Sequence, residues 1–230
     1  MIRINNFNNT ILKDISFHLQ EGENLLILGS NGAGKSTLAK LLCGIIYSEN
    51  IELFSNKLHT LNAKQRAKLI NYIPPKLEIF DEYISLKEYL EISKLYSDSS
   101  VNEVLALLDL QELQDKSCKT LSSGEQQLTM LASSILHNAF ITIYDEPTAN
   151  LDPQKTLKVY NILSGNYVQN RIIITHDLNL AYKLGYKILY VEDGKIVFFD
   201  TNKKFFEDEN LEKFFSSSLK RVDDYFMVNL

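Results

Sequence analysis

The stretch Gly29-Ser30-Asn31-Gly32-Ala33-Gly34-Lys35-Ser36-Thr37 decides the fold of this 230-residue chain. It fits the pattern G-x-x-x-x-G-K-S/T, with an additional internal glycine at position 32. An apolar run over residues 24–28 precedes it, and an apolar helical pattern from Ser36 to Ile46 follows it. Strand, loop and helix in this order are the context that such a motif requires. The stretch therefore predicts a nucleotide phosphate site, and the alternative is a flexible glycine-rich turn.

The loop has the chemistry that a triphosphate needs. Glycines let backbone N–H groups turn inward as an anion-binding nest, and the following helix directs its positive N-terminal end at the same point. Lys35 can reach the β- and γ-phosphates, the Ser36 hydroxyl can ligate Mg²⁺, and Thr37 can touch the α-phosphate. We expect ATP and Mg²⁺ as cofactors. The expected contacts to ATP from this loop are Ser30, Asn31, Gly32, Ala33, Gly34, Lys35, Ser36 and Thr37.

A second part of the site is expected at the end of a buried strand. Phe140 to Tyr144 is an apolar run, and Asp145 and Glu146 follow it directly. Two adjacent carboxylates after such a strand are costly unless a cation or a reaction uses them. We predict that Asp145 lies on the metal side, together with Ser36, and that Glu146 polarises the attacking water. The alternative is a plain strand-end turn closed by Pro147.

Strand and helix patterns alternate along the chain, which predicts an α/β fold with a mainly parallel sheet. The expected architecture is a P-loop NTPase core with an N-terminal antiparallel β subdomain and an inserted α-helical subdomain, all in one domain over residues 1–230. We place the core at about 1–75 and 120–205, the helical insertion at about 76–119, and a short tail at 206–230.

The expected elements follow from periodicity and turn residues. The strands are Ile2–Ile4, Ile15–Leu19, Arg171–Thr175 and the hairpin Lys187–Val191 with Lys195–Phe199, which turns at Glu192-Asp193-Gly194. The helices are Leu86–Leu95, Val101–Leu113, Leu121–Leu136, Lys155–Leu163 and Leu178–Leu184. The tail is expected to hold a helix from Asn210 to Phe215 and a last strand.

Composition narrows the class of protein. A net charge of −5 argues against nucleic acid as a partner. No apolar run approaches the roughly 20 residues that cross a bilayer, and the first residues do not form a signal peptide, so we expect a cytoplasmic protein. Of the two lone cysteines, Cys43 is expected in the core, and the exposure of Cys118 is left open. The basic run Lys64 to Lys68 is a solvated helix face or, alternatively, a membrane-surface helix.

Further motifs carry a family resemblance. Leu121-Ser122-Ser123-Gly124-Glu125-Gln126-Gln127 is similar to the LSGGQ signature of ABC transporter ATP-binding subunits and stands at the family's usual distance before Asp145. Asp145-Glu146-Pro147-Thr148-Ala149-Asn150-Leu151-Asp152 resembles the segment that leads into the family's D-loop, and Ile174-Thr175-His176-Asp177 resembles its switch region. The motifs occur in the family's order, and the likeness covers about residues 1–200.

The resemblance implies a mechanism. Two such chains would form a homodimer head to tail with two ATP molecules between them. Ser122, Ser123, Gly124 and Glu125 would contact the nucleotide held by the partner's phosphate loop. Catalytic roles would fall to Glu146 as general base, to Lys35, and to His176 at the γ-phosphate. Phe7 would stack on adenine. The alternatives are a plain core or surface role for Phe7 and a buried core histidine at position 176.

The sequence departs from the family at three positions. Ser123 replaces a glycine and Glu125 replaces the usual glutamine of the signature. Pro75 stands where the family usually has a glutamine that ligates Mg²⁺ and senses the membrane partner. Because proline has no side-chain oxygen and no N–H, Mg²⁺ would rely on Ser36, phosphate oxygens and water. We expect slower hydrolysis or altered coupling, with ATP binding retained.

The segment Leu58 to Pro74 and the tail Asn210 to Phe215 resemble the ATPases of importers for iron-siderophores, haem and cobalamin. The expected partners are two transmembrane permease subunits, docked on the helical subdomain, which would place the chain on the inner face of the cell membrane. A zinc or manganese importer ATPase and a soluble ABC ATPase are the alternatives. A chromosome or DNA-repair ATPase would need a coiled-coil insertion, and no sustained heptad run is present.

Overall fold

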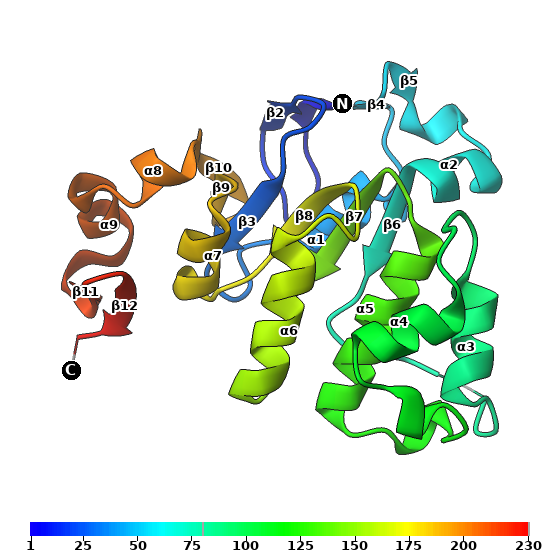
Figure 1. Cartoon of the computed structure of the whole chain (residues 1–230). Coiled ribbons are helices and arrows are strands. Elements are labelled where there is room, and N and C mark those ends of the chain that lie inside the picture. Colours follow the sequence, from blue (N-terminus) through cyan, green and yellow to red (C-terminus); the bar gives the residue numbers. More distant parts are fainter. Residues whose placement is uncertain (80, 230) are drawn as a thin grey trace. The chain divides into compact units, whose positions relative to one another are not determined.

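The computed structural model describes residues 1–79 and 81–229 (Figure 1). The chain divides into two units. The first unit comprises Met1–His59 together with Ile174–Leu230, and the second comprises Thr60–Ile173. This division follows contacts within the chain. The boundaries expected for a core, a helical insertion and a tail are a different partition and stay a prediction.

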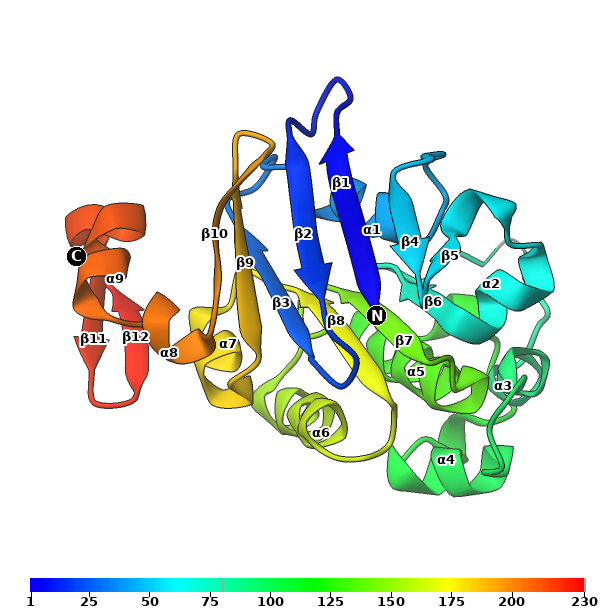
Figure 2. The same ribbon diagram turned by 90° about the horizontal axis from the view of Figure 1, so that it is seen from above.

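An antiparallel sheet begins the first unit, as the sequence predicts. Its strands run in the order β2-β1-β4-β5, and Figure 2 shows β1 and β2 side by side. The strands are β1 (Ile2–Phe7), β2 (Ile15–Leu19), β4 (Ile51–Leu53) and β5 (Asn56–Lys57). Alternation buries Ile15, Phe17 and Leu19 and exposes the residues between them. Strands β4 and β5 were not predicted, because two or three residues are too short for a period-two pattern.

A parallel pair holds the phosphate loop of the first unit. Strand β3 (Leu25–Gly29) pairs parallel with β9 (Lys187–Glu192), and β9 pairs antiparallel with β10 (Lys195–Asp200). The predicted hairpin turn is confirmed: Asp193 and Gly194 have φ values of 48° and 77°, the left-handed pair that a two-residue hairpin uses.

Helix α1 (Lys35–Leu42) follows the loop and ends earlier than the predicted Ile46. The cap is Cys43, and Gly44 turns the chain out of the helix with a φ of 70°. Beyond this turn Ile45 is exposed, so its apolar character had extended the predicted helix wrongly. Helix α7 (Leu178–Leu184) has the predicted bounds.

The C-terminal segment is built on aromatic packing. It comprises α8 (Asn202–Phe205), α9 (Asp208–Phe215), β11 (Leu219–Val222) and β12 (Tyr225–Val228). Phe205 stacks on Phe214 at 5.6 Å, and Phe206 lies 4.8 Å from Phe226 between ring centroids. The single last strand that the sequence predicts is wrong, since β11 and β12 form a hairpin.

The second unit contains a further set of strands. They are β6 (Ile70–Ile73), β7 (Ile141–Asp145) and β8 (Asn170–Ile174), in the order β8-β7-β6, and the last residue of β8 lies at the boundary of the unit. Strands β6 and β7 run parallel, with Tyr72 opposite Ile143. Every residue of β7 is buried, as expected for a central strand.

Within the described residues, the second unit has five α-helices, which precede or follow these strands along the chain. They are α2 (Ala63–Leu69), α3 (Leu86–Ser93), α4 (Val101–Leu107), α5 (Ser123–His137) and α6 (Pro153–Ser164). Helices α3 and α4 pack on α5 (Figure 1). Capping boxes begin four of the five, at Asn62, Ser85, Ser100 and Ser122. The chain also has 3₁₀ turns at Leu58–Thr60, Gln111–Leu113, Cys118–Thr120 and Ser216–Ser218.

Helix ends correct two predictions in this unit. Helix α4 stops at Leu107 and not at Leu113, because Asp109 takes a left-handed φ of 55° and the following 3₁₀ turn starts a new direction. Helix α3 stops at Ser93 and not at Leu95. Helix α2 carries the basic run Lys64 to Lys68 and buries none of its residues, as a solvated helix does.

The architecture is the predicted α/β fold, with parallel strand pairs, an N-terminal antiparallel sheet and a group of helices. Both cysteines are buried, and burial raises the pKa of Cys118 to about 11. This settles the exposure that the sequence left open. Within residues 1–79 and 81–229 no helix is both long and apolar enough to span a bilayer.

The hairpin turn at Gly194 gives a test of the first unit. A Cβ at position 194 would overlap the backbone carbonyl oxygen of Ile11, and the φ of 77° adds strain. Gly22 has a similar φ of 82° but open space around it. We expect Gly22→Ala to lower the free energy of unfolding by about 1 to 2 kcal/mol and Gly194→Ala by more than about 3 kcal/mol. Equal losses in urea denaturation of the two variants would show that the close approach at Gly194 is not important.

Candidate functional site

The phosphate loop between β3 and α1 is shaped by close backbone approach. A Cβ on Gly29 would overlap the carbonyl oxygen of Val191, and a Cβ on Gly34 would lie 2.8 Å from Cδ2 of Leu12. Gly34 also has a φ of 103°, which side-chain-bearing residues rarely adopt. These positions therefore require glycine for two reasons, space and backbone conformation. The structure thus explains the two glycines that begin and end the G-x-x-x-x-G part of the motif, Gly29 and Gly34.

Lys35 is held over this loop. Its side chain is buried, and Nζ donates hydrogen bonds to the carbonyl oxygens of Gly29 (2.8 Å) and Ser30 (2.9 Å). The ammonium group thus has a fixed place at the first turn of α1. The cap residue Gly34 makes no side-chain capping bond, so the helix N-terminus presents backbone N–H groups toward the loop.

The remaining loop residues differ in exposure. Ser30, Asn31, Gly32 and Ser36 are exposed, Thr37 is half-buried, and Ala33 is buried. The carbonyl oxygen of Ala33 accepts a hydrogen bond from the N–H of Gly194 at 3.1 Å. The carbonyl oxygen of Gly194 accepts in turn from the N–H of Lys13 at 2.8 Å. The β9–β10 turn therefore fixes the rear of the loop and leaves its polar face open.

The structure places an apolar side chain beside the loop that sequence reasoning missed. Ile11 is 46% exposed, and its Cγ2 lies 3.3 Å from the position that a Cβ on Gly34 would take. Phe7, the predicted adenine contact, is only 7% exposed and lies in β1 opposite Ile15. This burial favours the core alternative for Phe7, while its stacking on adenine stays a prediction. The available signal in the sequence was an isoleucine directly after a stretch rich in asparagine.

His176 belongs to the first unit and is exposed. It lies between β8 and α7, where the Asp177 side chain caps α7 by accepting from the N–H groups of Asn179 and Leu180. The alternative of a buried core histidine is therefore wrong. The expected contact of His176 with the γ-phosphate is a separate matter and stays a prediction.

The two carboxylates of the second unit have different environments. Asp145 is the last residue of β7, is 2% exposed, and accepts a hydrogen bond from the Tyr72 hydroxyl at 2.9 Å. Glu146 follows with a left-handed φ of 53°, unusual for a residue with a side chain. Its carbonyl oxygen accepts from Nε2 of Gln127 at 2.8 Å. Its side chain is half-buried. A strained backbone held by specific bonds is typical of functional positions.

The signature segment starts helix α5 with a capping box. Ser122 is the N-cap, and its N–H donates to Oε2 of Glu125 at 2.6 Å. Ser122 and Ser123 are exposed, so the segment presents hydroxyl groups at a helix N-terminus. Burial raises the pKa of Glu125, but the hydrogen bonds from Ser122 and the Lys116 ammonium at 3.5 Å outweigh this effect and hold the pKa below its usual value. The glutamate that departs from the family pattern is thus a structural part of the cap.

Gly124 is buried under a lysine of the next helix. A Cβ at Gly124 would lie 2.9 Å from Cδ and 3.3 Å from Nζ of Lys155. Lys155 Nζ also forms an ion pair with Asp152 at 2.7 Å. Sequence reasoning did not select Lys155, because one lysine in a helix carries no signal. The structure places its ammonium beside the signature glycine.

Pro75 lies just after β6 and is exposed, and no side-chain oxygen stands at this position. The candidate residues thus form two sets. The first unit holds the phosphate loop and His176, and the second holds Asp145, Glu146 and the signature segment.

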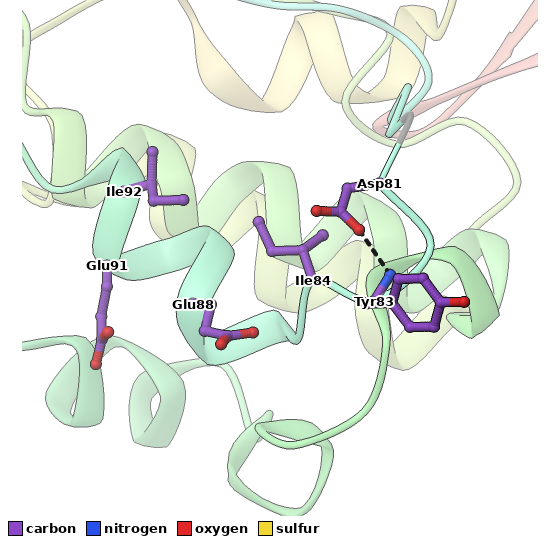
Figure 3. Close-up of a pocket in the computed structure, with 6 residues that line it drawn as sticks. All are labelled: Asp81, Tyr83, Ile84, Glu88, Glu91 and Ile92. Carbon is purple, nitrogen blue, oxygen red and sulfur yellow. Dashed lines mark hydrogen bonds between the residues drawn. The ribbon is translucent and has the colours of Figure 1, made fainter.

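An open hollow runs along α3 of the second unit, with a volume of about 590 Å³ (Figure 3). Tyr83 and Ile92 are 90% and 72% exposed there, and acidic side chains lie among them. The lining residues are Asp81, Tyr83, Ile84, Glu88, Glu91 and Ile92. This face combines exposed apolar area with negative charge, as a surface for a partner does.

The cap of α5 gives a pH-dependent test. Glu125→Gln keeps an acceptor for the Ser122 N–H but removes the charge, so at neutral pH we expect the free energy of unfolding to fall by about 0.5 to 1 kcal/mol. Because the folded pKa lies below the usual 4.5, this contribution is complete above pH 4.5 and is lost as the pH falls through the folded value. Urea denaturation at neutral and at acidic pH measures it. The control is Glu103→Gln, the same box position in α4. Hydrogen bonds from Ser100, followed by the charge of Lys94, lower the pKa of Glu103, and no salt bridge to it is found among the described residues. The idea fails if Glu125→Gln is as stable as the parent protein at neutral pH.

Comparison with known proteins identifies the family. Residues 12–149 match the ABC transporter family. A candidate ABC transporter ATP-binding protein of Methanosarcina acetivorans is 34% identical over 223 residues, covering 88% of this chain and 81% of its own. The arginine transport ATP-binding protein ArtP of Haemophilus influenzae is 30% identical over 219 residues, covering 85% and 90%. A candidate ABC transporter ATP-binding protein of Clostridium tetani is 32% identical over 199 residues. The match covers 81% of this chain but only 45% of that relative, so this chain spans less than half of its length.

Solved structures share the fold. An ATP-binding subunit of an ABC transporter superposes with a TM-score of 0.78 at 21% identity, covering 89% of this chain and 91% of that one. An ATP-binding cassette solved as a dimer with ADP and Pi gives 0.69 at 22% identity, covering 88% and 99%. With a phosphate loop, a capped signature helix and a family match over more than half of its length, the chain belongs to the ABC transporter family as an ATP-binding subunit with ATPase activity.

Proposed function

We propose that this chain powers an importer for iron-siderophore, haem or cobalamin, as one of two identical ATPase subunits. Two observations carry the ATPase role. Lys35 is fixed over a loop that requires glycines. The signature segment begins a capped helix. The importer type rests on the resemblance of Leu58 to Pro74 and of the tail. ArtP is named for arginine, so cargo needs its own test.

The proposed roles follow from the chemistry of each side chain. Residues 30–37 and the N-terminus of α1 bind the phosphates, and Lys35 neutralises charge at the β- and γ-positions. Glu146 is the proposed general base for the attacking water. Its backbone is left-handed, and Gln127 holds its carbonyl oxygen. His176 contacts the γ-phosphate, in keeping with its exposure.

The donor set fits Mg²⁺. Asp145 is a buried carboxylate, and among the described residues no lysine, arginine or histidine forms an ion pair with it. A buried charge of this kind is stabilised by a cation. Ser36 is an exposed hydroxyl in the first turn of α1. Mg²⁺ prefers oxygen ligands and keeps several waters. We propose Ser36 and Asp145 as its protein ligands, with phosphate oxygens and water completing the shell. When bound, it would neutralise charge on the phosphates.

We further propose a head-to-tail homodimer. Ser122, Ser123, Gly124 and Glu125 would face the nucleotide of the partner copy, with the N-terminus of α5 toward its phosphate. Lys155, paired with Asp152, lies beside Gly124 at this surface. The fold likeness to a cassette solved as a dimer with ADP and Pi supports this arrangement.

The hollow along α3 is the proposed contact for the two permease subunits. Tyr83 and Ile92 offer apolar area, and Glu88 and Glu91 offer negative charge to a basic partner (Figure 3). Through this contact the chain would lie on the inner face of the cell membrane. The net charge of −5 gives no support for a nucleic-acid partner. A zinc or manganese importer ATPase and an ABC ATPase without a permease are the second readings.

Cargo uptake separates the transport readings. Cells that lack this chain and its permease should lose uptake of one labelled chelate, haem or cobalamin, and keep uptake of arginine, zinc and manganese. Loss of arginine uptake would point to the function for which ArtP is named. Unchanged uptake of all of these would favour a soluble ATPase.

ATP turnover and assembly test the enzyme. We expect Lys35→Ala to lower ATP affinity by at least about tenfold, because the phosphates lose a charge-assisted contact. Glu146→Gln should retain binding, abolish most hydrolysis, and accumulate as an ATP-bound dimer in gel filtration with light scattering. A Glu146→Gln protein that stays monomeric in saturating ATP would contradict the shared-nucleotide arrangement.

We propose that Pro75 limits the rate of ATP hydrolysis. Restoring a side-chain amide with Pro75→Gln should raise kcat several-fold, because a further oxygen becomes available near the metal and the water. Pro74→Gln is the matched control, since it removes the neighbouring proline and adds the same amide one residue away. Steady-state hydrolysis at saturating Mg²⁺ measures both. If Pro75→Gln turns over no faster than the parent protein, the proline does not limit the reaction.

A further inference from the structure

A tyrosine reaches the metal-side carboxylate from the neighbouring strand. Tyr72 lies in β6 opposite Ile143 of β7, in a parallel pair. Asp145 is two residues beyond Ile143 on the same face of the strand, about 6.6 Å further along at about 3.3 Å per residue. The tyrosine ring spans this distance, and its hydroxyl donates to Oδ2 of Asp145 at 2.9 Å.

This contact is the side-chain hydrogen bond that the structure gives Asp145. The carboxylate is 2% exposed, and within residues 1–79 and 81–229 no cation pairs with it. The phenol therefore engages one oxygen, Oδ2, and the other oxygen is left for a further ligand. The hydrogen bond fixes the rotation of the carboxylate about its side-chain bond, whereas a carboxylate without such a bond would rotate freely.

We propose that Tyr72 is a positioning residue for the divalent-cation site of Asp145, an inference that rests on the proposed role of Asp145. Proline at position 75 supplies no side-chain oxygen, so the protein ligands proposed for the metal are Ser36 and Asp145. The orientation of each then carries more of the metal affinity. Tyr72 supplies that orientation through a neutral donor, which leaves the negative charge of the carboxylate available to the cation.

The purely structural reading is that Tyr72 only satisfies a buried acceptor. Both readings predict some loss of stability on removing the hydroxyl. They differ in the metal requirement of nucleotide binding, which only the positioning role changes. Tyr144 provides a matched control, because its hydroxyl bonds Ser134 at 2.9 Å, is fully buried, and belongs to the residue next to Asp145.

The experiment uses the full chain as Tyr72→Phe, Tyr144→Phe and Asp145→Asn. ATP affinity is measured in EDTA and then at increasing Mg²⁺, with Mn²⁺ binding followed by electron paramagnetic resonance. We expect Tyr72→Phe to keep the affinity in EDTA, to raise the Mg²⁺ concentration for half-maximal effect about tenfold, and to weaken Mn²⁺ binding alike. Tyr144→Phe should keep the parental metal dependence.

The outcomes separate the two levels of the proposal. Parental metal dependence in Tyr72→Phe, with a loss in Asp145→Asn, overturns the positioning role alone. Parental dependence in Asp145→Asn overturns the proposed metal role of Asp145 itself. If Tyr72→Phe does not fold, p-aminophenylalanine at position 72 keeps the ring and a weaker donor. The positioning role then predicts a metal dependence between those of the parent protein and Asp145→Asn, and a dependence as poor as that of Asp145→Asn despite the retained donor would overturn the proposal.

Discussion

Close backbone packing around the phosphate loop is the constraint on which the structure of the first unit depends. Backbone carbonyls of Val191 and Ile11 lie where side chains on Gly29 and Gly194 would stand, and Leu12 closes on Gly34. A hydrogen bond from Gly194 in the β9–β10 turn to the carbonyl oxygen of Ala33 holds the rear of the loop. Because neighbouring atoms leave the loop no space to move, its backbone is held in one conformation. Lys35 can then be fixed by hydrogen bonds to the loop's carbonyl oxygens. A preorganised cradle of N–H groups binds phosphate without a further cost in ordering.

The second unit uses helix caps for the same purpose. A capping box at Ser122 orients the N-terminus of α5, and Gln127 on the same helix holds the carbonyl of Glu146. The signature segment and the proposed general base thus belong to one rigid connection. A shift of α5 would be felt directly at Glu146, which gives a physical route by which a partner at the signature could influence the reaction.

The departures from the family pattern have different physical weights. Glu125 is explained by its cap and by Lys116, and its charge is balanced within the unit. Ser123 is exposed and costs nothing in packing. Pro75 lacks the side-chain oxygen that the family pattern has at this position, and the role proposed for Tyr72 acts on a ligand and not on the metal. The metal site is the place where this chain differs most in chemistry.

The sequence by itself determined the α/β class, the loop of residues 29–37, the carboxylates at 145 and 146 and the signature, because each depends on local spacing and residue type. The short strands β4 and β5, the end of α4 at Leu107 and the C-terminal hairpin were missed or wrong, since tertiary packing and single left-handed residues such as Asp109 set them. Only the tertiary structure placed Tyr72 on Asp145, Lys155 at Gly124 and Ile11 at Gly34. Each of these contacts joins segments far apart or on different elements, and no local pattern encodes which strand or helix will lie beside another.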